Sequence, residues 1–287
     1  MGKSIRAAYG EALVLCGKER EDIVVLDADV SSSTQSCLFA KAYPERFFNT
    51  GIAEANMTAM AAGLAAAGKI PFVNTFAVFL PSIGLAAARL FGSYAHIPIK
   101  LAGAYGGLSD AFDGPSHHAL EDIAVMRTLP GYEVYVPCDA VQTAYITRYA
   151  ASTPQAMYLR LSRDVFPDIY LQDQTFERGK GVVVHQGTDA TVIACGLMVG
   201  HALQAAELLA ERGISLQVVD MFCIKPIDRQ LIYRCASQTK AIVTAEEHSV
   251  IGGLGSAVAE VLVQEGCGVP MRLVGMQDCH TECGPYA

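Results

Sequence analysis

Three titratable side chains stand close together in the segment Asp113-Gly-Pro-Ser-His-His118. A loop rich in glycine and proline that carries Asp113, His117 and His118 does not serve core packing. Histidine changes its charge near neutral pH, and a carboxylate accepts hydrogen bonds from hydroxyl groups. The segment therefore predicts a site that binds hydroxyl groups and exchanges protons.

Glu54 is a carboxylate in an apolar surrounding, at the start of a predicted helix. Its neighbours Ile52, Ala53, Ala55 and Met57 are expected to bury it. An ionised carboxylate is costly in such a place unless it is paired. Glu54 is therefore predicted to bind a partner that shares its proton. The simpler alternative is a glutamate that the helix dipole stabilises.

Aromatic and basic side chains follow two other predicted strands. Phe76 and Phe79 are three residues apart in Thr75-Phe-Ala-Val-Phe79, so they can form one wall of a flat pocket where the chain turns helical, although aromatic pairs usually belong to the core. Arg160 and Arg163 are expected to follow a strand, and Arg163 can hold an anionic group by two parallel hydrogen bonds.

Alternating strand and helix patterns must position these side chains. In the first half we predict strands at 22–27, 71–75 and 98–102 and helices at 4–18, 55–67, 85–94 and 120–128, with Ser4 as an N-cap. In the second half we predict strands at 190–194, 214–220 and 241–245 and helices at 197–212 and 256–264. The pattern indicates an α/β protein with domains at 1–165 and 186–287, joined by a linker at 166–185. Each domain is expected to be a mostly parallel sheet with helices on both faces.

Composition excludes several classes of protein. The 287 residues carry 21 Lys and Arg against 29 Asp and Glu, a formal charge of −8, with 52% hydrophobic and 17% charged residues. Such a chain is too apolar for a disordered protein and too acidic for a nucleic-acid binder. The uncharged stretch 70–88 contains two prolines and polar residues, so we expect core rather than a membrane span. Nine scattered cysteines indicate reduced thiols in a cytoplasmic protein.

Two further motifs have simpler explanations. Gly252-Gly-Leu-Gly255 lacks the third glycine of a dinucleotide fingerprint, because Val258 occupies its place, so a tight strand-to-helix turn is expected. Cys279-His-Thr-Glu-Cys283 has no second pair at zinc spacing, so no metal is assigned to it. No Walker-type loop and no Gly-x-Ser-x-Gly elbow occurs.

Taken together and in order, these segments resemble the C-terminal portion of transketolase, specifically the second subunit of the split, two-subunit type. The matching segments are residues 4–13, 26–30, 46–54, 61–64, 75–79, 113–117, 161–163, 220–226 and 246–255. The resemblance covers nearly the whole chain. It implies a pyrimidine-binding domain followed by the small transketolase C-terminal domain.

The resemblance also implies roles for single residues. Glu54 takes the place of the family glutamate that hydrogen-bonds the aminopyrimidine ring of thiamine diphosphate and is catalytic, and Phe76 and Phe79 match the aromatic residues that pack against that ring. His117, also catalytic, and Asp113 match residues that contact the carbonyl and hydroxyls of the sugar. Arg6, Ser33 and Arg163 match groups that bind the sugar phosphate.

A partner chain is implied as well. The family binds the diphosphate and its Mg²⁺ or Ca²⁺ through a Gly-Asp-Gly motif followed by an asparagine, and this sequence has no such motif. We therefore expect an N-terminal transketolase subunit to carry the diphosphate-binding domain, in an α2β2 assembly with sites at the interface. The assembly would transfer a two-carbon ketol unit from a ketose phosphate to an aldose, whereas this chain alone is expected to be inactive.

Tyr105 departs from the family pattern, because it stands where a histidine usually contributes to the phosphate end of the site. A neutral phenol there suggests an acceptor other than the ordinary pentose phosphate. The chain also stops at Ala287, short of the expected last helix of the family. Three alternatives remain open: the β subunit of a 2-oxo acid dehydrogenase E1 component, a 1-deoxyxylulose-5-phosphate-synthase-like enzyme, and a non-catalytic partner that kept the fold.

Overall fold

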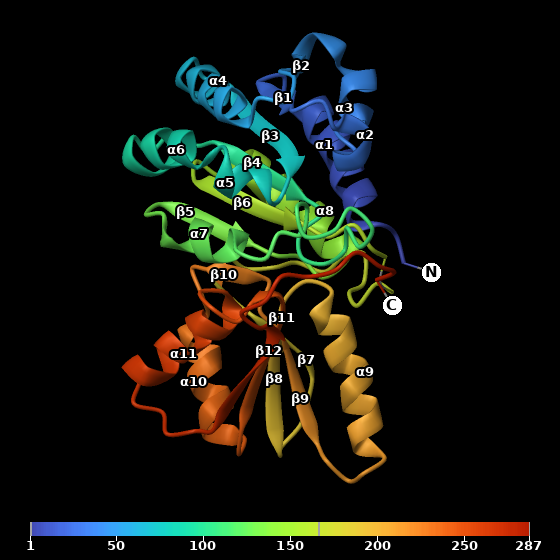
Figure 1. Cartoon of the computed structure of the whole chain (residues 1–287), viewed down its shortest axis with the longest axis vertical. Helices are drawn as coiled ribbons and strands as arrows, with labels where there is room; N and C mark the ends of the chain where they lie inside the picture. Colours follow the sequence, from blue (N-terminus) through green and yellow to red (C-terminus); the bar gives the residue numbers. More distant parts are fainter. Residues whose placement is uncertain (1, 166, 287) are drawn as a thin grey trace.

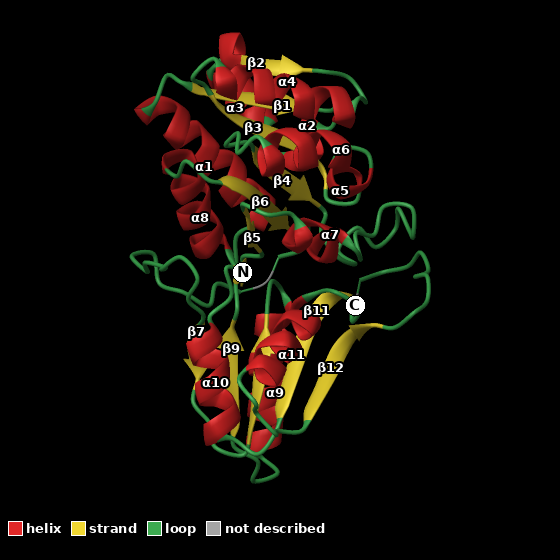
Figure 2. Ribbon diagram, turned by 90° about the vertical axis from the view of Figure 1, so that its left-hand side faces the viewer, coloured by secondary structure: helices red, strands yellow, loops and turns green. Residues whose placement is uncertain are grey.

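The computed structural model describes residues 2–165 and 167–286 and contains two α/β lobes, each built on its own sheet (Figures 1 and 2). The first sheet has the strand order β10-β5-β6-β4-β3-β1-β2, and all pairs are parallel except β10 with β5. Its strands are β1 (Ile23–Asp27), β2 (Phe47–Asn49), β3 (Ile70–Phe76), β4 (Lys100–Ala104), β5 (Tyr132–Tyr135), β6 (Ala156–Leu161) and β10 (Cys223–Lys225).

Helices cover both faces of the first sheet, because successive strand residues point to opposite sides. In β1, Ile23 and Val25 belong to a core with α1, α3 and α8, whereas Val24 and Leu26 belong to a core with α4 and α7. The helices of this lobe are α1 (Ile5–Glu19), α2 (Ser31–Thr34), α3 (Cys37–Ala42), η1 (Pro44–Arg46), α4 (Glu54–Ala66), α5 (Phe79–Ser82), α6 (Leu85–Ala87), the π-helix η2 (Ala88–Tyr94), α7 (Asp122–Thr128) and α8 (Ala140–Ser152).

The second sheet has the strand order β12-β11-β8-β9-β7 and is parallel except for β7. Its strands are β7 (Val182–His185), β8 (Ala190–Ala194), β9 (Leu216–Asp220), β11 (Ile242–Ser249) and β12 (Met271–Met276). Its helices are α9 (Met198–Ala210), α10 (Arg229–Gln238) and α11 (Leu254–Gln264). The α/β prediction with two mostly parallel sheets is confirmed. All of β7 lies within the predicted linker 166–185.

Strand β10 joins the two lobes. It follows β9 of the second sheet along the chain, yet it pairs with β5 at the edge of the first sheet, where Figure 1 shows it in orange beside green β5. The two lobes therefore share backbone hydrogen bonds in addition to packed side chains. No helix within residues 2–165 and 167–286 is long and apolar enough to cross a membrane; the stretch 70–88 forms β3 followed by short helices.

Several predicted elements differ from the structure in detail. The strand predicted at 98–102 lies at Lys100–Ala104. The helix predicted at 85–94 becomes a π-helix after Ala87. Within it Gly92 lies against Tyr132, where a Cβ atom would be 2.0 Å from the phenolic oxygen. Ser4 occupies the N-cap position of α1 but makes no capping side-chain bond.

Asp220 is a fully buried carboxyl group where the lobes meet, at the end of β9. Tyr170 and Gln142 each donate a hydrogen bond of 2.7 Å to its Oδ2, while its Oδ1 has no partner among the described residues. Burial raises the pKa of Asp220 to about 7. The folded protein therefore binds a proton here that the unfolded chain releases near pH 4.

This shift predicts the pH dependence of stability. Because the pKa is raised on folding, ionisation of Asp220 destabilises the fold as pH rises from about 4 to 7, and the cost is complete above that range. Replacing Asp220→Asn removes the cost. The free energy of unfolding of the variant minus that of the wild type should therefore be about 2–3 kcal/mol larger at pH 8 than at pH 5, which means that the variant gains relative stability. Urea titrations at both pH values measure it, with the exposed Asp173→Asn as control; equal differences at the two pH values would contradict the assignment.

Candidate functional site

The predicted site residues come together at the carboxyl ends of neighbouring parallel strands. β6, β4, β3 and β1 are adjacent in the sheet and end at Leu161, Ala104, Phe76 and Asp27. The chain then continues to Arg163, Tyr105, Phe79 and Ser33, respectively. In open α/β sheets, ligands bind outside this edge. The topology thus explains why side chains far apart in the sequence converge here.

An aromatic group forms the centre of the site. The ring centroids of Phe76 and Phe79 are 5.9 Å apart, as their spacing predicts. His117 stands edge-on to both, at 5.7 Å from Phe76 and 5.5 Å from Phe79, and Tyr105 lies 4.7 Å from Phe76 on the other side. Phe76 and Tyr105 are almost fully buried. These rings offer flat apolar surface with one imidazole at its edge.

Glu54 lies beside this group as the first residue of α4, with only 3% of its surface exposed. Thr75, the neighbour of Phe76 in β3, donates a hydrogen bond of 3.2 Å to its Oε1. The predicted burial is confirmed, but the predicted cause is partly wrong, because Ile52 is 81% exposed and Ala55 is exposed too. Helical geometry turns residue 54 inward together with Met57, Thr58 and Ala61, three, four and seven positions later.

Two arginines flank Tyr105. The guanidinium carbon of Arg6 lies 4.7 Å from the Tyr105 ring centroid and that of Arg163 lies 5.3 Å from it. Nη1 of Arg6 also donates to the Tyr105 hydroxyl at 3.0 Å and to the backbone carbonyl of Ser33 at 2.5 Å. The structure therefore brings Arg6, Ser33 and Arg163 together, but Ser33 contributes its carbonyl to the contact. Burial lowers the pKa of Arg6 from its ordinary value.

Asp110 is a residue of this site that the sequence analysis missed. It is fully buried, and its Oδ1 lies 3.3 Å from Nη1 of Arg163. Burial and the adjacent Asp113 carboxylate raise the pKa of Asp110 to about 7. Asp113 itself is exposed, and its backbone N–H donates to the Asp110 carbonyl at 2.9 Å. The only sequence signal was an acidic residue in the glycine-rich loop after β4.

The two adjacent histidines have different environments. His117 faces the phenylalanines, whereas His118 is buried and its Nδ1 lies 2.6 Å from the hydroxyl of Thr281. Gly284 donates a backbone hydrogen bond of 3.2 Å to Ala111 in the same loop. The C-terminal segment thus packs against the 110–118 loop. His118 therefore contacts the C-terminal segment through Nδ1, whereas His117 contacts the phenylalanines.

Arg160 is not part of the site, contrary to its predicted position after a strand. It lies within β6, is buried, and pairs with Asp122 at 2.7 Å. Its Nη2 donates to the carbonyls of Ala119 and Glu247, each at 2.8 Å. Because Glu247 belongs to β11 of the second lobe, Arg160 fixes the two lobes together behind the site.

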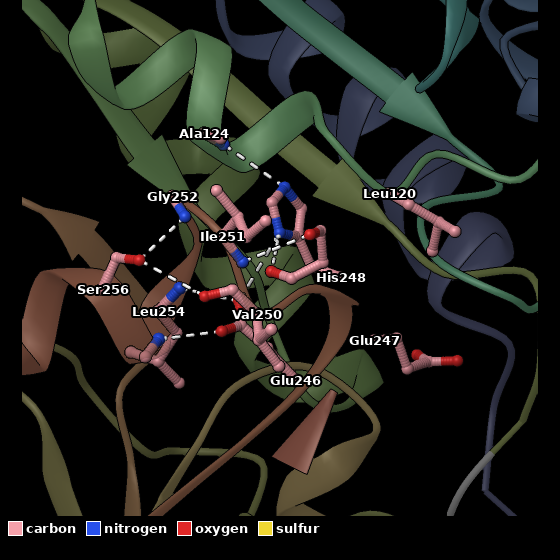
Figure 3. Close-up of polar contacts among 12 residues, drawn as sticks. Leu120, Ala124, Glu246, Glu247, His248, Val250, Ile251, Gly252, Leu254 and Ser256 are labelled. Atoms are coloured by element: carbon pink, nitrogen blue, oxygen red, sulfur yellow. Dashed lines mark hydrogen bonds and ion pairs between the residues drawn. The ribbon is translucent and has the colours of Figure 1, made fainter. Parts of the chain in front are cut away.

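The backbone N–H groups of the turn at Gly252–Gly255 bind the side-chain carboxylate of Glu246. Figure 3 shows the Glu246 carboxylate at the start of α11, where Oε2 accepts from Leu254 N–H at 2.6 Å and Oε1 from Gly255 N–H at 2.8 Å. A Cβ on Gly253 would lie 2.1 Å from Glu246 Oε2. The prediction of a tight turn here is confirmed, and the glycines serve close contact with Glu246.

All nine cysteines are unpaired, and Cys279 and Cys283 are exposed. Within the part of the chain that the structure describes, no three His, Cys, Asp or Glu side chains group together as metal ligands.

Comparison with known proteins gives the same assignment along the whole chain. Residues 2–168 match the family described as transketolase, pyrimidine binding domain, and residues 179–287 match that described as transketolase, C-terminal domain. A Methanocaldococcus jannaschii protein named as a transketolase C-terminal section is 42% identical, over 98% of this chain and 89% of its own length.

One solved structure and one longer relative add to this. A split-gene transketolase, described as an inactive β4 tetramer, is 49% identical with a TM-score of 0.90, and the match covers 96% of this chain and 89% of that one. Human transketolase is 40% identical over 91% of this chain but only 42% of its own length. The similarity therefore covers less than half of a single-chain relative.

Proposed function

The chain belongs to the transketolase family as a subunit of the split type, and from that premise we propose that it forms the pyrimidine-binding half of a two-subunit, thiamine diphosphate-dependent transketolase. The assembly transfers a two-carbon ketol unit from a ketose phosphate to an aldose acceptor. The observation that carries the proposal is the buried Glu54, which is bonded to Thr75, the strand neighbour of Phe76. The Phe76, Phe79 and His117 rings pack together, and Arg6 and Arg163 flank Tyr105 beside Phe76.

The residues present fit the pyrimidine ring of the cofactor. A pyrimidine is flat, aromatic and carries nitrogen atoms, and the site offers flat rings next to a buried carboxylate. Thiamine diphosphate, when bound, supplies the nucleophilic carbon that attacks the ketose carbonyl. Glu54 holds a proton at a ring nitrogen, with Thr75 fixing the position of its carboxylate. Phe76 and Phe79 exclude water from that contact.

The remaining residues are proposed to orient the sugar. His117, at the edge of the phenylalanine pair, hydrogen-bonds the substrate carbonyl and exchanges a proton with it. The exposed carboxylate of Asp113 accepts hydrogen bonds from sugar hydroxyls. Arg6 and Arg163, with the Ser33 backbone, lie where the far end of a sugar phosphate would bind.

A partner subunit completes the site. The diphosphate and its Mg²⁺ or Ca²⁺ are assigned mainly to an N-terminal transketolase subunit, because the Gly-Asp-Gly motif is absent from this sequence. Large apolar side chains of the first lobe are exposed, as expected of a surface that a partner covers. They are Ile52 (81%), Ile83 (50%), Leu90 (52%), Tyr94 (81%) and Phe112 (69%). We propose an α2β2 assembly, and a cytoplasmic location in keeping with nine unpaired thiols.

A substrate comparison tests the proposed reaction against 2-oxo acid chemistry. The chain is reconstituted with a diphosphate-binding transketolase subunit, thiamine diphosphate and Mg²⁺, and supplied with xylulose 5-phosphate and a mixture of aldoses. We expect cofactor-dependent formation of ketoses longer by two carbons. The same assembly should not decarboxylate pyruvate or branched 2-oxo acids at a comparable rate. Efficient turnover of a 2-oxo acid without ketol transfer would reject the proposal.

A further inference from the structure

The subsite around Tyr105 carries its own counter-charges. Two guanidinium groups, those of Arg6 and Arg163, contribute positive charge. Two carboxyl groups, those of Asp110 and Asp113, contribute negative charge when they are ionised. A site built for a phosphate dianion needs an excess of positive charge. Here the positive charge is largely balanced by the chain itself.

Asp110 makes the decisive contact. Its carboxyl group is fully buried, whereas the side chain of Arg163 is 41% exposed. A ligand can therefore reach Arg163 from solvent, while Asp110 contacts the same guanidinium group from the protein interior. The second oxygen of Asp110 has no hydrogen-bond partner among the described residues. When Asp110 is ionised, which prevails above pH 7, it therefore repels an anion bound by the exposed part of Arg163, and water cannot screen this repulsion.

Tyr105 adds to the same preference. It occupies the space between the two guanidinium groups and takes one hydrogen bond from Arg6 at 3.0 Å. A phenol brings no positive charge, but it donates to and accepts from hydroxyl groups. Asp113 is exposed and can accept a hydrogen bond from a hydroxyl, which a fully ionised phosphate cannot donate.

We propose that Asp110 is a specificity-determining residue that adapts this subsite to an acceptor aldose whose far end is an uncharged hydroxyl rather than a phosphate dianion. The inference rests on the proposed function and narrows one part of it, the acceptor. Asp110 would also weaken the binding of a ketose phosphate donor whose phosphate reaches the same arginines. The test therefore uses one donor without a sugar phosphate for every acceptor.

The experiment measures acceptor preference in the reconstituted assembly. β-Hydroxypyruvate serves as donor, since it releases carbon dioxide when it gives up its two-carbon unit. The measured quantity is kcat/KM for D-ribose 5-phosphate divided by kcat/KM for D-ribose. In the wild type this ratio should stay below about 10, because Asp110 offsets the attraction of the arginines for phosphate. The assay is run at pH 8, where a carboxyl group with a pKa of about 7 is mostly ionised. Asp110→Asn keeps the shape and should raise the ratio about 10-fold at this pH.

The control is Asp173→Asn, which neutralises an exposed carboxylate in the loop after Tyr170 and should leave the ratio unchanged. A ratio for Asp110→Asn within twofold of the wild type overturns the proposal. So does a wild-type enzyme for which ribose 5-phosphate is the best acceptor in a panel of aldoses. Absence of any ketol transfer by the wild-type assembly would instead reject the proposed function.

If the wild-type assembly shows no ketol transfer, a binding measurement still tests the role of Asp110. Isothermal titration of the full chain with glycerol 3-phosphate needs no partner and no turnover. At pH 8, Asp110→Asn should bind this phosphate ester about tenfold more tightly than the wild type, provided that circular dichroism shows the same fold. Equal affinities of the two proteins overturn the assignment of Asp110.

Discussion

Glu54→Ala is expected to lower kcat of the reconstituted assembly at least about 100-fold while leaving the chain folded. Glu54 is 3% exposed and its carboxylate is held by Thr75, so no water molecule can take over its proposed contact with a bound pyrimidine at the same geometry. General acid–base contributions typically amount to 10²- to 10⁴-fold. The loss should appear with every donor and acceptor, because Glu54 faces the cofactor and not the sugar.

Three measurements identify the cause of that loss. Thermal unfolding should show a stable variant, since alanine at the first helical position removes a buried charge together with one hydrogen bond. Calorimetry should show weaker binding of thiamine diphosphate to the assembly. Glu207→Ala, at an exposed position of α9, is the matched control and should retain full turnover. If Glu54→Ala keeps its turnover, this chain is a non-catalytic partner that kept the fold.

The periodic elements of the fold were predictable, because buried strands and long helices carry their own apolar patterns. Besides several short helices, two long helices, α8 and α10, were not predicted, although their starts were marked in the sequence. Asp139 and Asp228 cap α8 and α10 by accepting from the N–H three residues on, at 2.8 Å and 2.9 Å. Aspartate before a helix is a strong N-cap signal, so these helices lay within reach of sequence reasoning.

Two edge strands, β7 and β10, could not be predicted from the sequence. β7 and β10 have only four and three residues, and each pairs antiparallel at the edge of a sheet. Strands this short have no measurable period, and their state depends on the partner strand. The partner of β10 is β5, on the other lobe, which no local pattern of the sequence encodes.

The candidate site likewise contains residues that the sequence could predict and residues that it could not. Phe76, Phe79 and Glu54 could be selected because each breaks or extends a local pattern next to a predicted strand end. Asp110 could not, since its importance comes from the distant Arg163, 53 positions later. The orientation of His118 depends on Thr281, 163 positions away. Contacts of this kind follow from the tertiary fold and not from spacing along the chain.

The isolated chain is expected to show no thiamine diphosphate-dependent ketol transfer, at least about 1,000-fold below the assembly. In the proposed site Glu54, Phe76 and Phe79 contact only the pyrimidine of the cofactor, and the sequence has no Gly-Asp-Gly motif for the diphosphate. Another chain must then complete the binding of the cofactor. When that chain is left out, its contribution to cofactor binding is lost entirely.

Titrating the chain with the diphosphate-binding subunit should restore activity until the two are equimolar, as interface sites require. Ile52 is 81% exposed just before Glu54, and Tyr94 is equally exposed on the π-helix, so charged residues at these positions test the contact. Ile52→Asp and Tyr94→Asp should raise the partner concentration needed for half-maximal activity, whereas Leu208→Asp, at an exposed site on α9, should not. Full turnover by the purified chain alone would refute the two-subunit mechanism.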